Sequence, residues 1–177
     1  MNLLDKDRVG TLSDMASLRD SGTEAAPPLL SETTEVTMNV RHLDHINMTV
    51  RDFDETVDWY GRVFDFELVE EEVTDGVRWG VVRSGEALLC IYEDPAREHL
   101  DRFELRDRGL HGIAHFGLRI TDAEEWLKTV DREAIEVLYD GEIAWPHSRS
   151  WYIKDPTGYE IEVALWNGDH ISFDPMG

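Results

Sequence analysis

The order of one strand, one helix and three strands occurs twice in this chain, and this repeat restricts the fold more than any other feature. In the first unit, polar and apolar residues alternate over 43–50, which is the signature of a strand. The apolar residues of DETVDWYGRVF then fall on one face of a helix, for which Asp52 and Asp54 are candidate N-caps. Three short strands with glycines between them follow, in FELVEEEV, VRWGVVRS and ALLCIYE.

The second unit has the same order. We predict a strand over 113–120, a helix that begins near Asp122, and strands over 135–139, 149–154 and 159–165. The last two are joined by DPTG, a tight turn in which proline presets φ and glycine accepts a positive φ. The first strand of each unit carries a histidine, which is itself a sign of internal repetition. We therefore expect an α+β protein that repeats β-α-β-β-β.

Size and composition fit one domain made from two small modules, since 177 residues with 41% apolar side chains can bury a core. No apolar run approaches the ~18 residues of a membrane-spanning helix. The first residues, MNLLDKDRVG, lack the pattern of a secretory signal, so we expect a cytoplasmic protein. The single cysteine, Cys90, excludes an intrachain disulfide and a cysteine-based zinc site, and we expect it in the core.

The net charge of −21 is extreme for this length and repels nucleic acid and anionic membranes. Lysine occurs at only three positions, and arginine supplies the remaining positive charge. We favour an acidic surface adapted to high salt, as in a halophilic host, over a simple bias toward arginine. The net charge therefore indicates the environment of the protein and gives no information about its reaction.

The chain divides into segments of different composition. Residues 1–38 are rich in Ser, Thr, Glu, Ala and Pro, which is typical of a flexible arm; packing of this arm on a partner subunit is the alternative. The rest is predicted as a domain over 39–170, with modules at about 41–94 and 111–166, a charged connector at 94–110, and a tail at 171–177. The connector is expected to be a solvated loop or short helix, with a lid over the site as the alternative.

Three residues on separate predicted strands, His45, His115 and Glu162, form a candidate metal-ligand set. Two imidazoles and one carboxylate suit a divalent metal such as Fe(II), Mn(II), Zn(II), Co(II) or Ni(II). Such a set leaves coordination positions open for a substrate's oxygens, which indicates catalysis. His45 shares its strand face with Asn47 and Thr49, and the other two also lie opposite apolar neighbours.

At this point the chain resembles the vicinal oxygen chelate superfamily. The resemblance covers about residues 41–166 and is carried by LDHINMTVRDFDETVDWYGRVFDFEL, GIAHFGLRI and SWYIKDPTGYEIEV, with the superfamily's DPxGxxIE pattern. That group contains glyoxalase I, fosfomycin-resistance thiol transferases, methylmalonyl-CoA epimerase, extradiol dioxygenases and bleomycin-binding proteins. The resemblance implies two paired β-α-β-β-β modules that form a cupped mixed sheet around a divalent metal, held by His45, His115 and Glu162.

The fourth protein ligand of glyoxalase I and the epimerase is a Glu or Gln on the last strand of the first module. Here the matching position is Cys90, and Glu93 would reach it only if the register slipped by one residue. Three protein ligands are therefore expected, which counts against the lyase and epimerase members.

The fosfomycin thiol transferases are one three-ligand group. LLCIYEDPAR resembles their corresponding stretch, and Tyr152 matches an active-site tyrosine there. The basic residues that hold the phosphonate are not matched, because Glu142 lies near the expected lysine and no arginine follows Glu162. Binding of a phosphonate would then require Arg149 or Arg119 instead.

The extradiol dioxygenases are the other three-ligand group and give the preferred prediction. SWYIKDPTGYEIEVALW resembles their C-terminal motif, including the tyrosine ten residues before the glutamate, which implies Fe(II) and a catalytic role for Tyr152. His147 is the candidate for the second catalytic residue, although it is not at the family's spacing; His99 and His111 are alternatives. Most members also have two double-module domains, whereas this chain has one.

A rival of a different class is a metal-free, drug-binding protein of the bleomycin-resistance kind, against which the complete ligand set argues. In single-chain members with two modules, the partner's module often completes each cup. The resemblance therefore implies a homodimer, with His45 contributed across the interface, that acts on a small molecule and not on nucleic acid or membranes.

Overall fold

The structure is a computed structural model and describes residues 40, 42–169 and 171–174. The predicted arm over 1–38 lies outside the described residues. Among the residues that are described, no helix has the length and apolar character needed to cross a membrane.

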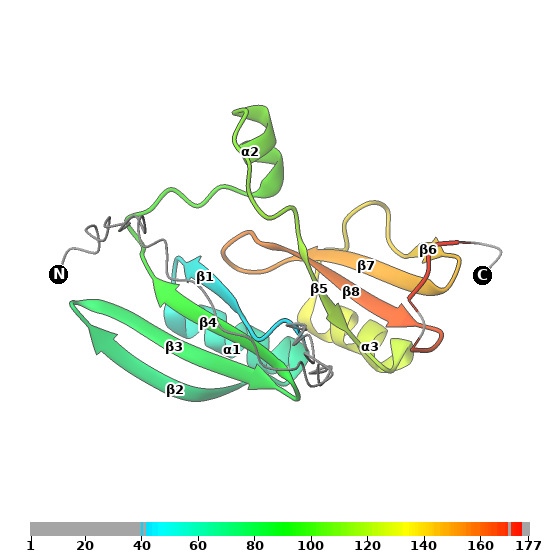
Figure 1. The fold of residues 1–177 in the computed structure, drawn as a ribbon, viewed down its shortest axis with the longest axis horizontal. Helices are drawn as coiled ribbons and strands as arrows, with labels where there is room; N and C mark the ends of the chain where they lie inside the picture. Colours follow the sequence, from blue (N-terminus) through cyan, green and yellow to red (C-terminus); the bar gives the residue numbers. More distant parts are fainter. Residues whose placement is uncertain (1–39, 41, 170, 175–177) are drawn as a thin grey trace, which may run out of the picture. The chain divides into compact units, whose positions relative to one another are not determined.

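Two four-stranded sheets form the domain, each with one parallel and two antiparallel strand pairs (Figure 1). The first sheet has the order β1-β4-β3-β2, and the second has the equivalent order β5-β8-β7-β6. This repeat confirms the predicted α+β fold. The elements of the first module are β1 (Ile46–Val50), α1 (Phe53–Phe64), β2 (Glu67–Thr74), β3 (Val77–Ser84) and β4 (Ala87–Glu93). Those that follow are α2 (Arg102–Asp107), β5 (Phe116–Arg119), α3 (Ala123–Glu133), β6 (Ile143–Trp145), β7 (Ser148–Lys154) and β8 (Glu160–Trp166).

Aspartates cap both ends of helix α1. Asp52, the first of the two candidate caps, is the N-cap, and its carboxylate accepts a hydrogen bond from the Glu55 amide at 2.9 Å. The helix ends at Asp65, which adopts a left-handed conformation with φ of 55°. Its apolar face, which includes Phe53 and Tyr60, is buried.

The strand alternation holds in β7 and β8 of the second sheet. In the second module, alternate apolar residues of β7 and β8 pack in the core with Trp126 of α3. The opposite face of β8 carries Glu160 and Glu162, as the period of two requires. The apolar backs of the strands are Trp151, Ile153, Ile161 and Val163.

The predicted strand over 135–139 is wrong, because the strand that pairs with β7 is β6, at Ile143–Trp145. The Leu138 amide donates a hydrogen bond to the Tyr152 carbonyl at 2.8 Å, but the chain then turns away. Tyr139 and Asp140 have φ values of 57° and 64°, and two left-handed residues in succession cannot continue a strand.

The prediction that Cys90 is a core residue is also wrong, because its side chain is half-exposed. Its neighbours Leu89 and Ile91 face the core, so the alternation turns Cys90 to the other face of β4. There it lies beside Asn47 in the register of β1 and β4.

Contacts between α1 and α3, and between β1 and the β7–β8 turn, join the two modules. Phe64 stacks on Trp126 with ring centroids 5.6 Å apart, and the Tyr159 hydroxyl donates to the Thr49 carbonyl at 3.0 Å. The Tyr60 hydroxyl donates to the Asp155 carboxylate at 3.1 Å. Asp155 also accepts hydrogen bonds from three backbone amides of the DPTG turn and the residue after it.

Asp155 should make stability depend on pH in an unusual direction. Burial raises the pKa of this carboxyl to about 6, although the hydrogen bonds that it accepts oppose the shift. Because the folded pKa lies above the unfolded value, the stabilisation is present at low pH and is lost as pH rises through about 6. From about pH 5 to about pH 7.5, the free energy of unfolding of the wild type should fall by about 1.4 kcal/mol relative to Asp155→Asn.

Urea unfolding of both proteins at the two pH values measures this difference. Subtraction of the variant removes the contributions of the other carboxyls. A difference that stays constant or grows with pH would show that Asp155 is ionised in the folded protein throughout this range.

Candidate metal site

The pairing of β5 with β8 brings two of the three predicted ligands together. Gly117 lies opposite Glu162 in this parallel register, and His115, two residues earlier, therefore faces the same side. The His115 Nε2 atom is 3.1 Å from the Glu162 Oε2 atom. Both side chains are partly exposed, at 32% for His115 and 21% for Glu162, so the pair is open to an incoming ligand.

Neighbouring side chains of β7 hold Glu162 and cover His115. The Ser150 hydroxyl donates to Glu162 Oε1 at 2.7 Å, which leaves Oε2 for His115 or a metal. Tyr152 lies opposite Glu162 in the antiparallel register, and its ring meets His115 edge-on at 5.4 Å. Burial raises the pKa of Tyr152 to about 12, and the nearby Glu162 carboxylate adds to the shift. The phenol therefore keeps its proton at neutral pH.

The structure does not bring His45 to this pair within one chain. His45 directly precedes β1 in the first module, is 44% exposed, and contacts the Asp44 carboxylate through Nδ1 at 2.8 Å. Among the described residues, no three His, Cys, Asp or Glu side chains lie close enough together to hold a metal. One chain thus brings two of the three candidate ligands together and carries the third, an exposed histidine, on the other module.

The other predicted histidines lie apart from His115. His147 occupies the turn between β6 and β7, and its Nε2 donates to the Asp174 carbonyl at 2.7 Å. Ser148, the next residue, is four strand positions from Tyr152, or about 13 Å. His99 in the connector donates to the Asp94 carbonyl at 2.9 Å.

Glu160, Arg102 and Tyr139 form a second group at the site that the sequence did not lead us to expect. The Glu160 carboxylate accepts from Arg102 Nη1 at 2.7 Å and from the Tyr139 hydroxyl at 2.9 Å. The alternation of β8 already put Glu160 on the same face as Glu162. Arg102 comes from the connector, for which the sequence offers no periodic signal, and Tyr139 comes from the segment that the sequence wrongly predicts as a strand.

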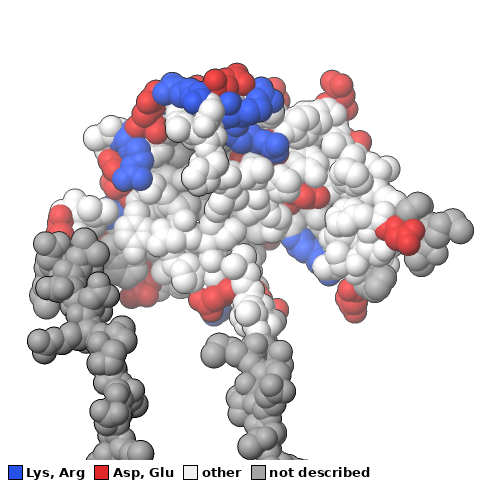
Figure 2. Space-filling model, turned by 45° about the horizontal axis from the view of Figure 1, so that its top comes forward, with Lys and Arg blue, Asp and Glu red and all other residues white. Residues whose placement is uncertain are grey.

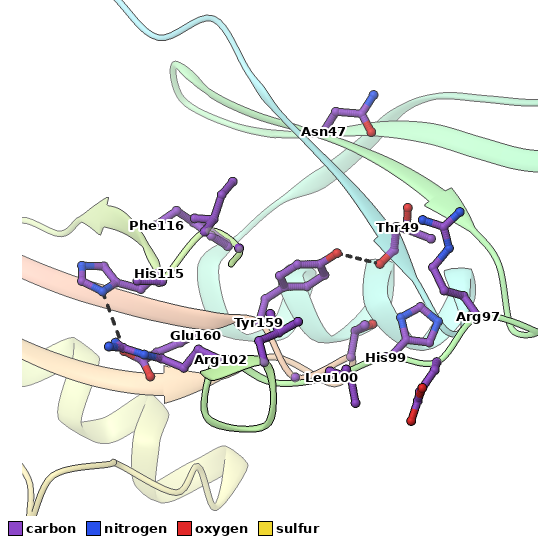
Figure 3. A pocket seen from close by; sticks show the side chains of 17 residues that line it. Asn47, Thr49, Arg97, His99, Leu100, Arg102, His115, Phe116, Tyr159 and Glu160 are labelled. Carbon is purple, nitrogen blue, oxygen red and sulfur yellow. Dashed lines mark hydrogen bonds and ion pairs between the residues drawn. The ribbon is translucent and has the colours of Figure 1, made fainter. Parts of the chain in front are cut away.

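A cavity of about 280 Å³ opens beside His115 (Figure 3). Figure 3 shows His115 and Glu160 at one end and Thr49, Arg97 and His99 at the other. The wall therefore combines β1, the connector and the start of β5 and β8.

The basic side chains of the connector are neutralised by carboxylates. Figure 2 shows Lys and Arg gathered with Asp and Glu at the top of the view, where α2 lies. Arg102 pairs with Glu160, and Lys154 pairs with Asp101 at 2.6 Å. The remaining arginines of the connector have partners too: Arg97 pairs with Asp94, Arg106 with Asp107, and Arg108 with Glu98.

The two arginines proposed for a phosphonate are also engaged. Arg149 lies 3.4 Å from Glu142 and its guanidinium covers the Trp151 ring, while the Arg119 guanidinium lies over Trp166. The surroundings of His115 thus offer carboxylates and paired cations, which favours a neutral ligand over a dianion.

Comparison with known proteins identifies the family. The sequence profile of the Glyoxalase/Bleomycin resistance protein/Dioxygenase superfamily matches residues 42–163, and the chain belongs to this superfamily. No curated protein matches the chain significantly.

Solved structures share the fold at low sequence identity. A glyoxylase/bleomycin resistance protein/dioxygenase domain from Frankia sp. EAN1pec is 15% identical with a TM-score of 0.62, over 75% of this chain and 96% of that one. The fosfomycin resistance protein FosX from Mesorhizobium loti is 20% identical with a TM-score of 0.54, over 74% and 94%. A variant of FosX from Listeria monocytogenes, complexed with Mn(II) and 1S,2S-dihydroxypropylphosphonic acid, is 18% identical with a TM-score of 0.56, over 74% and 95%.

Proposed function

We propose that this protein is a divalent-metal-dependent enzyme that acts on a small, neutral molecule with two adjacent oxygens. The observation that carries the proposal is the His115–Glu162 pair, with its 3.1 Å separation, beside the protonated Tyr152. These side chains lie on one face of three adjacent strands, and that face is open to a ligand.

The donor atoms of the pair fit a metal. Two ligands each about 2.1 Å from an octahedral ion lie about 3.0 Å apart when they are adjacent. The observed 3.1 Å separation of His115 Nε2 and Glu162 Oε2 agrees with that value, and the Ser150 hydrogen bond fixes the carboxylate. The same separation also lets the two side chains share a proton when no metal is bound.

We propose that the third ligand is His45 of a second copy of the chain, in a homodimer with two sites. His45 is exposed on the module that lacks the His115–Glu162 pair. The pair needs a third ligand, and His45 of the second copy would supply it. Binding of Mn(II) by the FosX neighbour supports a divalent metal. Fe(II) is the metal that we favour for the reaction, with Mn(II), Zn(II), Ni(II) and Co(II) as alternatives.

The reaction that we favour is extradiol-type ring cleavage of a catechol. The metal would supply a Lewis acid and, as Fe(II), a site at which oxygen reacts. Ser150 holds the Glu162 carboxylate, and Tyr152 can donate a hydrogen bond to a substrate oxygen because its phenol stays protonated. The paired state of the surrounding arginines favours the neutral catechol over a phosphonate.

A thiol transfer or related opening reaction of the fosfomycin-resistance kind is the second candidate. It is supported by the FosX neighbours and by the phosphonic acid bound in one of them. A phosphonate would have to displace carboxylates from Arg149 or the connector arginines.

Anaerobic reconstitution with Fe(II) at high salt, followed by oxygen uptake with a panel of catechols, tests the proposal. We expect uptake with a yellow ring-cleavage product, and no uptake by His115→Ala, which loses a metal ligand. Stoichiometric metal binding without uptake would favour the thiol-transfer or lyase reactions. A wild type that binds no metal would favour the drug-binding alternative.

A further inference from the structure

Glu160 is a buried carboxylate directly behind the proposed metal ligand His115. Its side chain is 1% exposed, and its Oε1 atom lies 3.7 Å from the Nδ1 atom of His115. Figure 3 shows the two side chains joined by this contact at the end of the cavity. Metal ligation as such does not require this carboxylate, because His115 would bind through its other nitrogen, next to Glu162.

The Nδ1 atom of His115 needs a hydrogen-bond partner, and Glu160 is placed to provide one. Nδ1 is buried and has no hydrogen-bond partner in the described structure. When Nε2 binds a metal, the proton of the neutral ring must reside on Nδ1. A buried donor without an acceptor weakens whatever state requires it. A movement of a few tenths of an ångström would bring Nδ1 within hydrogen-bond distance of Glu160 Oε1.

The structure holds Glu160 in place with two long-range contacts. Arg102 reaches it from α2, whose position is fixed by the Asp101 N-cap and by the Asp101–Lys154 ion pair at 2.6 Å. Tyr139 reaches it from the loop after α3, where its φ of 57° is rare for an aromatic residue. Unfavourable backbone conformations concentrate where a side chain must be aimed at a site.

We propose that Glu160 is a positioning residue that accepts a hydrogen bond from the Nδ1–H group of His115 and thereby directs the Nε2 lone pair toward the metal. Arg102 and Tyr139 hold its carboxylate for this task. The inference rests on the proposed metal site. Carboxylates behind metal-binding histidines typically change metal affinity 10- to 100-fold when they are removed.

Titration of the metal-free protein with Mn(II), followed by the electron paramagnetic resonance of the free ion, tests this role. Glu160→Gln keeps the size of the side chain but removes its charge, and we expect Mn(II) binding to weaken about 10- to 100-fold. Tyr139→Phe leaves the carboxylate in place and should weaken binding less, by under about tenfold. Glu142→Gln removes a carboxylate of the same module that pairs with Arg149, and should bind as the wild type does.

A second measurement separates positioning from a structural role. In the Zn(II)-loaded wild type, proton–nitrogen NMR should show the Nδ1 proton of His115 far downfield, as a hydrogen bond to a carboxylate requires. This resonance should move upfield in Glu160→Gln and stay in place in Glu142→Gln. Unchanged Mn(II) affinity and an unchanged Nδ1 resonance in Glu160→Gln would overturn the inference, while failure of the wild type to bind Mn(II) would instead overturn the proposed metal site.

Discussion

An equimolar mixture of His45→Ala and His115→Ala should recover about one quarter of the metal-binding sites of the wild type, although each variant alone should have none. If each site combines His45 of one copy with His115 and Glu162 of the other, a mixed dimer contains one intact site and one site that lacks both histidines. Random exchange makes half of the dimers mixed, which gives the expected quarter. Isothermal titration with Mn(II), after subunit exchange at high salt, measures the number of sites.

A second mixture provides the control. His115→Ala and Glu162→Ala both damage the His115–Glu162 pair, so every site of their mixed dimer lacks a ligand and no recovery is expected. The contrast between the two mixtures therefore tests the arrangement of the ligands and not the mere presence of a dimer. If the first mixture stays without sites while the wild type binds Mn(II), the ligands come from one chain; a wild type that sediments as a monomer would also contradict the prediction.

The proximity of His115 and Glu162 could be predicted from the sequence because strand alternation and parallel pairing determine it. His115 and Glu162 each lie on the polar face of an alternating strand, and β5 and β8 are neighbours in the repeated topology. The same reasoning predicts where Tyr152 and Ser150 point. Such a pattern can be read from a single sequence, because a shift of one residue in the strand register would bury the polar face.

Residues outside the strands could not be predicted in this way. Arg102 is one of several arginines that lie among acidic residues in the connector. Nothing in the sequence distinguishes it from the others, and only the tertiary fold pairs it with Glu160. The strand predicted over 135–139 is absent because Tyr139 and Asp140 adopt left-handed conformations that the residue types do not announce. Residue type alone predicts Cys90 in the core, whereas the alternation of β4 turns it to the face opposite that of Leu89.

Tyr152→Phe should lower kcat about 100- to 1000-fold while leaving Mn(II) affinity within about twofold, because in the proposed reaction the phenol donates a hydrogen bond to the substrate and does not bind the metal. The ring contact with His115 is kept in the variant, so the site should retain its shape. Burial raises the pKa of Tyr152 to about 12 in the metal-free protein, so the phenol carries its proton when metal and substrate bind at neutral pH. The measurement is steady-state oxygen uptake with the most active catechol of the panel, at several pH values.

Tyr60→Phe is the matched control, because it also removes one buried phenol oxygen. That oxygen donates a hydrogen bond to Asp155 and takes no part in the proposed reaction. We expect Tyr60→Phe to lower the free energy of unfolding by about 1 kcal/mol without a change in kcat. A Tyr152→Phe enzyme with kcat within threefold of the wild type would assign Tyr152 to packing. A loss of rate that tracks a loss of bound metal would instead assign its hydroxyl to the support of Glu162, whose carboxylate, after burial, contributes most to the raised pKa of Tyr152.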